Sequence, residues 1–140
     1  MVNYRTITSS RADVKKFLAD MKAILCSPDF DIEHDFFFQE YRLNDDPEDM
    51  CNNSNTMLAL DYSASNIVEE LKTLEIQDYS ETVLDSKKEG LVPLYVFGRV
   101  IKGKEVYIKV RIKSRKNNSE FIFCLSFHFA KHPISTFPYA

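Results

Sequence analysis

The sequence predicts one α+β domain in which helices cover one face of an antiparallel sheet. Two segments have apolar residues at helical spacing, and three runs near the C-terminus have the alternation and the aromatic and β-branched residues of strands. These runs follow one another with short connections and no helix between them, which predicts a three-stranded meander. The length of 140 residues and the 44% hydrophobic content fit one core that needs no disulfide or metal. We therefore expect residues 1–140 to form a single domain.

The first predicted helix spans residues 10–25. Its apolar residues share one face: Val14, Phe17, Leu18, Met21, Ile24 and Leu25. The hydroxyl of Ser9 or Ser10 can accept a hydrogen bond from the first free amides of this helix, and Pro28 ends the segment.

A strand and an acidic loop are predicted next. The aromatic run 35–42 (DFFFQEYR) has the composition of a strand. The Asn-rich stretch 43–55 contains four carboxylates that suggest a cation site, but their spacing does not match an EF-hand loop, so a solvated loop is the prediction. These carboxylates belong to Asp45, Asp46, Glu48 and Asp49.

A second helix is predicted after Ser63 or Ser65, followed by a polar, turn-like stretch at 77–90. The apolar face of this helix consists of Ile67, Val68, Leu71 and Leu74. The meander strands are predicted at 92–100, 105–114 and 120–129.

Alternation assigns the residues of the last two strands to two faces. The core face is predicted to hold Val106, Ile108, Val110, Ile112, Phe121, Phe123, Leu125, Phe127 and Phe129. The opposite face is predicted to hold Tyr107, Lys109, Arg111, Lys113, Ile122, Cys124, Ser126 and His128. A two-residue turn at Asn117-Asn118 pairs Tyr107 with His128, and a four-residue turn makes them diagonal neighbours; either way they lie roughly 5–8 Å apart. Burial is expected to exclude a register that sets the Phe face against the Lys/Arg face.

The other hairpin adds side chains to this second face. A three-residue loop with Gly103 in the left-handed conformation would pair Val100 with Lys104. Leu94, Val96 and Val100 then point to the core. The open face of the meander is predicted to carry Tyr95, Arg99, Tyr107, Lys109, Arg111 and His128.

The formal net charge of −3 hides a strong asymmetry along the chain. Residues 1–86 carry 7 Lys/Arg and 18 Asp/Glu, whereas residues 87–140 carry 11 Lys/Arg and 3 Asp/Glu. The local charges are therefore −11 and +8. A basic C-terminal part indicates a polyanion or an acidic partner, and the alternative is that the two parts pair with each other within one fold.

Several classes of protein are excluded or disfavoured by composition. No apolar run approaches the roughly 18 residues that cross a bilayer, and the start MVNYRTITSS lacks the apolar core of a signal peptide. Three widely spaced cysteines indicate reduced thiols in a cytoplasmic protein. With 3 glycines and neither GxGxxG nor a P-loop, a nucleotide-cradling loop is not expected.

A face that interleaves cations with tyrosines and one histidine suits RNA. Cations neutralise phosphates and aromatic rings stack on unpaired bases. When the RNA 2′-hydroxyl is the nucleophile, cleavage needs a base, an acid and positive charge, so no cofactor is expected. The predicted acid–base groups are Tyr107 and His128, and the predicted RNA contacts are Tyr95, Arg99, Lys104, Lys109 and Arg111. The alternative is a half-solvated sheet face without catalysis.

Metal and serine chemistry receive less support. His128 and His132 have HxxxH spacing, but on a strand such residues lie roughly 13 Å apart, too far to share one ion. Ser126 shares a face with His128, yet neither a GxSxG elbow nor an acidic partner accompanies it, and Cys124 is interpreted as a packing residue.

Three stretches resemble the MqsR family of bacterial type II toxins. They are MLALDYSASNIVEELKTLEIQDYSE (57–81), LYVFGRVIKGKEVYIKVRIK (94–113) and CLSFHFAKHP (124–133). The similarity covers roughly the last 85 residues and rests on the order and spacing of these stretches. It implies a RelE-like fold and a metal-independent endoribonuclease that cuts mRNA, free or on the ribosome, and that a cognate antitoxin protein neutralises.

The resemblance also assigns residues. Tyr107 matches the tyrosine of the family's V-Y-[IL]-K strand, and His128 occupies the position of the lysine in its final S-F-K strand. Two further positions depart from the family, because Glu81 stands where it has a lysine and Val96 stands near its glutamine.

The sequence thus predicts a toxin-type ribonuclease that uses Tyr107 and His128. One alternative is a non-catalytic domain of the same fold that binds RNA or protein through the same face. Another is a protein-interaction domain whose tail, HPISTFPYA, docks on a partner or on its own core.

Overall fold

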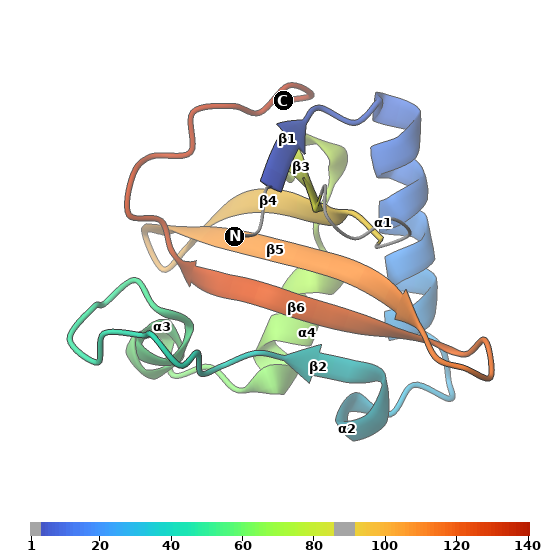
Figure 1. The fold of residues 1–140 in the computed structure, drawn as a ribbon, viewed down its shortest axis with the longest axis horizontal. Helices are drawn as coiled ribbons and strands as arrows, with labels where there is room; N and C mark the ends of the chain where they lie inside the picture. The colour runs from blue at the N-terminus through green and yellow to red at the C-terminus, as the bar shows by residue number, and fades with distance from the viewer. Residues whose placement is uncertain (1–3, 86–91) are drawn as a thin grey trace.

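The computed structural model describes residues 4–85 and 92–140, which form an α+β fold (Figure 1). The strands are β1 (Tyr4–Ile7), β2 (Phe36–Phe38), β3 (Tyr79–Asp85), β4 (Leu94–Ile101), β5 (Lys104–Ser114) and β6 (Glu120–Phe129). The helices are α1 (Arg11–Leu25), α2 (Ile32–Asp35), α3 (Asn53–Leu60), α4 (Ala64–Lys72) and the 3-10 turn η1 (Ile76–Asp78). One sheet has the order β1-β3-β4-β5-β6-β2, and only β2 runs parallel to its neighbour.

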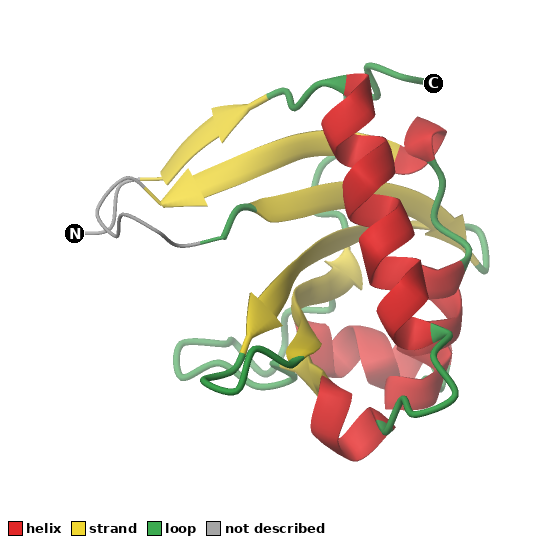
Figure 2. Cartoon of the chain, turned by 90° about the vertical axis from the view of Figure 1, so that its right-hand side faces the viewer, coloured by secondary structure: helices red, strands yellow, loops and turns green. Residues whose placement is uncertain are grey.

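The helices lie on one side of the sheet, which confirms the predicted α+β class (Figure 2). The Ser10 side chain caps α1 by accepting a hydrogen bond from the Asp13 amide at 3.1 Å, and α4 begins after Ser63. Apolar residues of α1, α3 and α4 form a core with Val106, Ile108 and Val110 of β5. Within the described part of the chain, no helix is both long and apolar enough to cross a membrane.

Strand β3 contradicts the prediction of a turn-like stretch at 77–90, of which residues 86–90 lie outside the described residues. Its polar residues are buried and mutually satisfied: the Thr82 hydroxyl lies 2.6 Å from the Ser9 hydroxyl and 2.7 Å from that of Tyr79. The polar composition therefore led to the wrong prediction of a turn, because the hydroxyls of this strand form hydrogen bonds with one another inside the fold. Strand β1, which pairs with β3, was also not predicted.

The region between α1 and α4 differs from the prediction as well. The strand expected at 35–42 contains only Phe36–Phe38, and α3 occupies part of the region expected to be loop. The asparagines that indicated a loop start this helix, because the Asn52 side chain accepts a hydrogen bond from the Asn55 amide at 2.7 Å.

Helix α3 covers the edge of β6 beyond the short strand β2. The Phe127 amide donates to Asn53 Oδ1 at 3.1 Å, and the Phe129 amide donates to Thr56 Oγ1 at 3.0 Å. Asn53 Nδ2 also donates to the carbonyl oxygen of Leu125 at 3.0 Å. Side chains of α3 thus replace a neighbouring strand along this part of β6.

Candidate nucleic-acid site on the open face of the sheet

Strands β5 and β6 bring Tyr107 and His128 together. The two residues are directly opposite in the antiparallel register, one of the two predicted arrangements, and their ring centroids lie 5.2 Å apart with an interplanar angle of 17°. Lys109 lies opposite Ser126, and its ammonium is 5.5 Å from the centroid of the Tyr107 ring. Because Val106, Ile108 and Val110 point to the helices, Tyr107, Lys109 and His128 lie on the face that the helices leave open.

A β-bulge at Leu125 changes which β6 residues share this face. Lys109 pairs with Ser126 whereas Val110 pairs with Cys124, so alternation along β6 reverses at this point. The predicted assignment is therefore wrong for the first half of β6: Ile122 and Cys124 are buried in the core, and Phe121 and Phe123 are half-buried on the open face.

The expected exclusion of a register that opposes phenylalanines to cations is also wrong. Phe123 lies opposite Arg111, and the Lys113 ammonium is 5.1 Å from the centroid of the Phe123 ring. Cations stack on these rings, and Phe37 of β2 covers Phe123 at a centroid distance of 5.3 Å. These contacts between rings and cations therefore stabilise a register that burial alone would disfavour.

The register predicted for β4 and β5 is wrong by one residue. Lys102 and Gly103 both have positive φ and form a two-residue turn, so Ile101, not Val100, pairs with Lys104. This shift places Tyr95 and Arg99 on the helix face and leaves Val100 exposed.

Tyr95 and Arg99 accordingly have structural partners. The Tyr95 ring stacks on Phe17 of α1 at 4.0 Å between centroids. The Arg99 guanidinium is 3.0 Å from the Asp78 carboxylate and 3.3 Å from that of Glu70. Neither side chain joins the cluster around His128.

The other two predicted RNA contacts lie on opposite faces. The Lys104 ammonium is 5.0 Å from the centroid of the buried Phe129 ring, on the helix face. Arg111 alternates with Lys109 along β5 and lies on the open face. The structure thus groups Tyr107, Lys109, Arg111 and His128.

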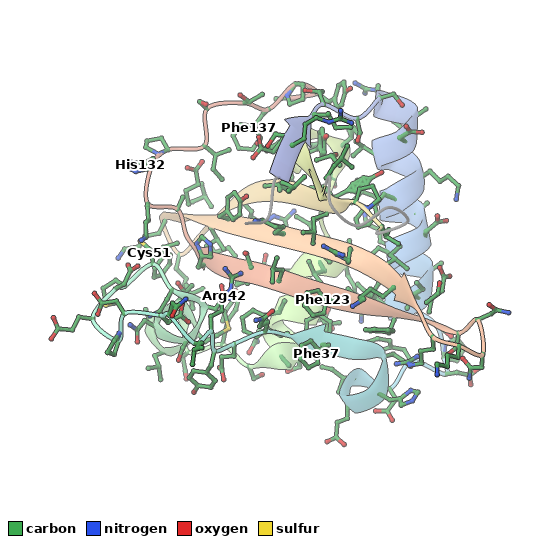
Figure 3. All side chains as sticks on the ribbon, in the orientation of Figure 1. Phe37, Arg42, Cys51, Phe123, His132 and Phe137 are labelled. Carbon is green, nitrogen blue, oxygen red and sulfur yellow. The ribbon has the colours of Figure 1, made fainter. Side chains whose placement is uncertain are left out.

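Arg42 joins this cluster and was not predicted. Its guanidinium donates to the Leu125 carbonyl at 2.7 Å and to the Ser126 hydroxyl at 3.0 Å, so it lies over the bulge of β6 (Figure 3). More than 80 residues separate these partners in sequence, and Arg42 begins an acidic stretch, so no local pattern indicated its role.

The surroundings of His128 define its protonation. Burial, together with the positive charges of Arg42 and Lys109, lowers the pKa of this imidazole, and the Phe129 carbonyl and Asp49 oppose that shift. His128 Nδ1 lies 2.9 Å from the Phe129 carbonyl oxygen, which can only accept a hydrogen bond. The proton of the neutral ring is therefore on Nδ1, and Nε2 has the free lone pair.

Burial shifts the pKa values of the two neighbours of His128 in opposite directions, upward for Tyr107 and downward for Lys109. It raises the pKa of Tyr107 to about 12, with a further contribution from the negative charge of Glu81, so the phenol keeps its proton. Burial and the charge of Arg42 lower the pKa of Lys109, whereas Glu81 raises it.

The C-terminal tail forms one wall of a cavity next to this cluster. The cavity has a volume of about 350 Å³, and its lining includes Glu81, Tyr107, His128 and His132. The tail packs on the open face at Gly98, where an added Cβ would lie 2.6 Å from Ile134 Cδ1 and 2.9 Å from a Phe137 ring carbon.

The end of the tail lies near the segment between β1 and α1 (Figure 1), and Tyr139 packs against the core. The Tyr139 hydroxyl donates to the Ser9 carbonyl at 2.6 Å, and its ring stacks on Tyr79 at 5.8 Å. The tail therefore docks on its own chain.

Among residues 4–85 and 92–140, no group of three or more His, Cys, Asp or Glu side chains is arranged to hold a metal ion. Three carboxylates of the acidic loop accept hydrogen bonds from backbone amides of their own turns: Asp45, Asp46 and Asp49.

Comparisons with known proteins identify no relative of this chain. No protein-family model matches it, and no curated protein or solved structure matches it either. The resemblance to the MqsR family, with its RelE-like fold, therefore stays a prediction.

Proposed function

We propose that this protein is the toxin component of a type II toxin–antitoxin system, a metal-independent endoribonuclease that cleaves mRNA at the Tyr107–His128 pair. The observation that carries the proposal is the stacking of these two rings beside Lys109 and Arg42 on the face that the helices leave open. It provides a base, an acid and two cations within one cluster, and the acid and the base, Tyr107 and His128, line the adjacent cavity.

His128 is proposed to be the general base. Its neutral ring has a free lone pair on Nε2, which takes the proton of the RNA 2′-hydroxyl. The 2′-oxygen then bonds to the adjacent phosphorus, and the bond between phosphorus and the 5′-oxygen of the next nucleotide breaks. The products are a 2′,3′-cyclic phosphate and a free 5′-hydroxyl.

Tyr107 is proposed to be the general acid, and the cations to stabilise the transition state. A phenol whose pKa is about 12 keeps its proton at neutral pH and can donate it to the departing 5′-oxygen. Lys109 and Arg42 would balance the charge that develops on the phosphoryl oxygens. Proton exchange with water then returns Tyr107 and His128 to their starting states.

The positions that correspond to the family's site residues are neighbours in the sheet, which supports this assignment. Glu81 lies opposite Val96 in the sheet, Val96 lies opposite Lys109, and Tyr107 lies opposite His128. The four positions that correspond to the family's site residues (Glu81, Val96, Tyr107 and His128) therefore belong to one patch of neighbouring strands, although Glu81 and Val96 differ from the family residues. Lys109 and Arg42 supply positive charge there, although Glu81 replaces a family lysine.

Glu81 also favours a second candidate, a domain of the same fold that binds RNA or a protein without cleavage. Its carboxylate lines the same cavity as Tyr107 and His128, where it would repel a phosphate. Such a domain would show salt-sensitive binding and no cleavage.

Induced expression of the wild-type chain, His128→Ala and Tyr107→Phe distinguishes the candidates. The ribonuclease is expected to arrest growth and to produce 2′,3′-cyclic phosphate ends in the presence of a chelator, and both variants are expected to relieve the arrest. Val100→Ala, at an exposed position near the end of β4 and outside the lining of the cavity, is the matched control and should remain toxic. Wild-type protein that leaves growth and cellular RNA unchanged would refute the proposal, and salt-sensitive binding without cleavage would establish the second candidate.

The proposed partner is a cognate antitoxin protein. Co-expression of the neighbouring gene is expected to restore growth and to yield a complex with the toxin. No rescue by either adjacent gene would contradict this part of the proposal.

A further inference from the structure

The open face carries a second feature, a strip of three phenylalanines at the far end of β5 and β6 from His128. We call Phe37, Phe121 and Phe123 the aromatic strip (Figure 3 labels Phe37 and Phe123). Phe37 is 53% exposed, and its ring is nearly parallel to that of Phe123, at an interplanar angle of 11°. The strip therefore presents a stacked aromatic surface to solvent.

Cations border the aromatic strip. The Lys113 ammonium is 5.1 Å from the centroid of Phe123, and the Arg115 guanidinium is 4.6 Å from that of Phe121. Asp35 balances the charge of Arg115 at 3.4 Å, whereas Lys113 and Arg111 add positive charge along β5. The charge beside the rings is thus complementary to a polyanion.

The aromatic strip and the Tyr107–His128 pair are connected along one strand. Tyr107, Lys109, Arg111 and Lys113 are alternate residues of β5 and share the open face. Lys113 lies six positions after Tyr107 along the strand, a distance of roughly 20 Å. A row of cations therefore runs from the proposed cleavage site to the phenylalanine rings.

We propose that the aromatic strip binds unpaired bases of the RNA strand whose phosphate is cleaved at Tyr107 and His128. This inference rests on the proposed function and defines the substrate as single-stranded RNA that continues for several nucleotides beyond the cut. Bases stack on the phenylalanine rings, and the phosphates between them follow Lys109, Arg111 and Lys113. A duplex does not fit, because its bases are already stacked inside the helix.

A protein partner is the competing occupant of such a patch. An apolar protein surface would bind by burying the surface of the rings and would gain little affinity from a row of cations. The alternation of Lys and Arg along β5 beside parallel rings favours RNA. Substitutions of Phe37 separate the two occupants, because leucine keeps an apolar surface but has no aromatic face.

The test compares two substrates, a dinucleotide that reaches only the cleavage site and a single-stranded RNA of about 8 nucleotides. Phe37→Ala and Phe37→Leu are expected to lower kcat/KM for the longer RNA by about fivefold or more, with dinucleotide cleavage unchanged. Phe37→Trp should keep the wild-type rate, since it restores an aromatic face. Leu43→Ala, at a fully exposed loop residue, is the control for surface substitution and should change neither rate.

Binding gives a second readout that does not depend on cleavage. A DNA oligonucleotide of the same sequence cannot be cleaved, because it has no 2′-hydroxyl. The fluorescence anisotropy of this DNA measures binding, and its affinity for Phe37→Ala and Phe37→Leu should fall in the same way. Wild-type protein that cleaves neither RNA refutes the proposed ribonuclease function, whether or not the aromatic strip binds bases. Wild-type protein that cleaves both, with Phe37→Ala unaffected on the longer RNA, overturns the proposed base binding. Full affinity in Phe37→Leu with loss in Phe37→Ala also overturns it, in favour of an apolar partner.

Discussion

Asn53 provides the sharpest test of how the fold positions the site. This side chain is 3% exposed and makes three hydrogen bonds: Nδ2 donates to the carbonyls of Gln39 at 2.8 Å and Leu125 at 3.0 Å, and Oδ1 accepts from the Phe127 amide at 3.1 Å. Two of the three partners belong to β6 at or next to its bulge. Asn53 therefore holds the segment that turns His128 toward the open face.

The expected cost of Asn53→Ala follows from these bonds. The substitution leaves the Phe127 amide buried without its acceptor, which costs about 1–3 kcal/mol. Loss of the two donated bonds adds about 1 kcal/mol, because the Leu125 carbonyl still accepts a hydrogen bond from Arg42. We therefore expect the free energy of unfolding to fall by about 2–4 kcal/mol.

Urea denaturation measures this change, with Leu58→Ala as the control. Leu58 lies on the same helix α3 and is 77% exposed, so its truncation should change the free energy of unfolding by less than about 0.5 kcal/mol. The m-value should stay constant, which attributes the change to the native state. An Asn53→Ala loss no larger than that of the control would refute the role given to α3 as a substitute strand.

Three further results are expected. Burial lowers the pKa of His128 below its ordinary value of 6.5, so kcat/KM for RNA should rise with pH to a plateau with a midpoint below 6.5; a midpoint above 6.5 would contradict the free-base assignment. Gly98→Ala should lower the free energy of unfolding in urea by about 1–3 kcal/mol, because the new Cβ meets Ile134. Adding Ile134→Ala to this variant should relieve that cost, and a double variant whose loss equals the sum of the two single losses would refute the contact between Gly98 and Ile134. Lys109→Met should weaken RNA binding and reduce its salt dependence. Arg99→Met should lower the melting temperature and leave RNA affinity unchanged, because Arg99 lies on the helix face; a loss of RNA affinity in Arg99→Met would contradict the register of β4.

Local pattern predicted the elements that have strong periodicity or clear caps. Helices α1 and α4 and the three strands of the meander were predicted within a few residues, because burial of one face imposes a regular apolar spacing. Strand β3 was missed, because its buried face is built from hydroxyls that satisfy one another through Ser9 and Tyr79, which no local pattern shows.

The candidate site shows the same division. The pairing of Tyr107 with His128 was one of the two predicted arrangements, but neither predicted turn forms, because Ser114 pairs with Glu120. The bulge at Leu125 shifts the register by one residue and so brings Tyr107 opposite His128. The assignment of Tyr95 and Arg99 failed by a single residue, because the sequence KGK fits both a two-residue and a three-residue turn. A shift of one residue moves every side chain of a strand to the other face.

The sequence by itself determined the α+β class and the strands of the meander, because periodicity is a local property of the chain. It also placed Tyr107 and His128 within reach of each other, but their direct pairing depends on the bulge at Leu125. Only the tertiary structure decided that Arg42 joins them, that the tail packs on Gly98, and that Phe123 points away from the core. The bulge at Leu125 is the physical reason for the last of these. Asn53 and Arg42, which both bond the Leu125 carbonyl, approach it only after the chain has folded.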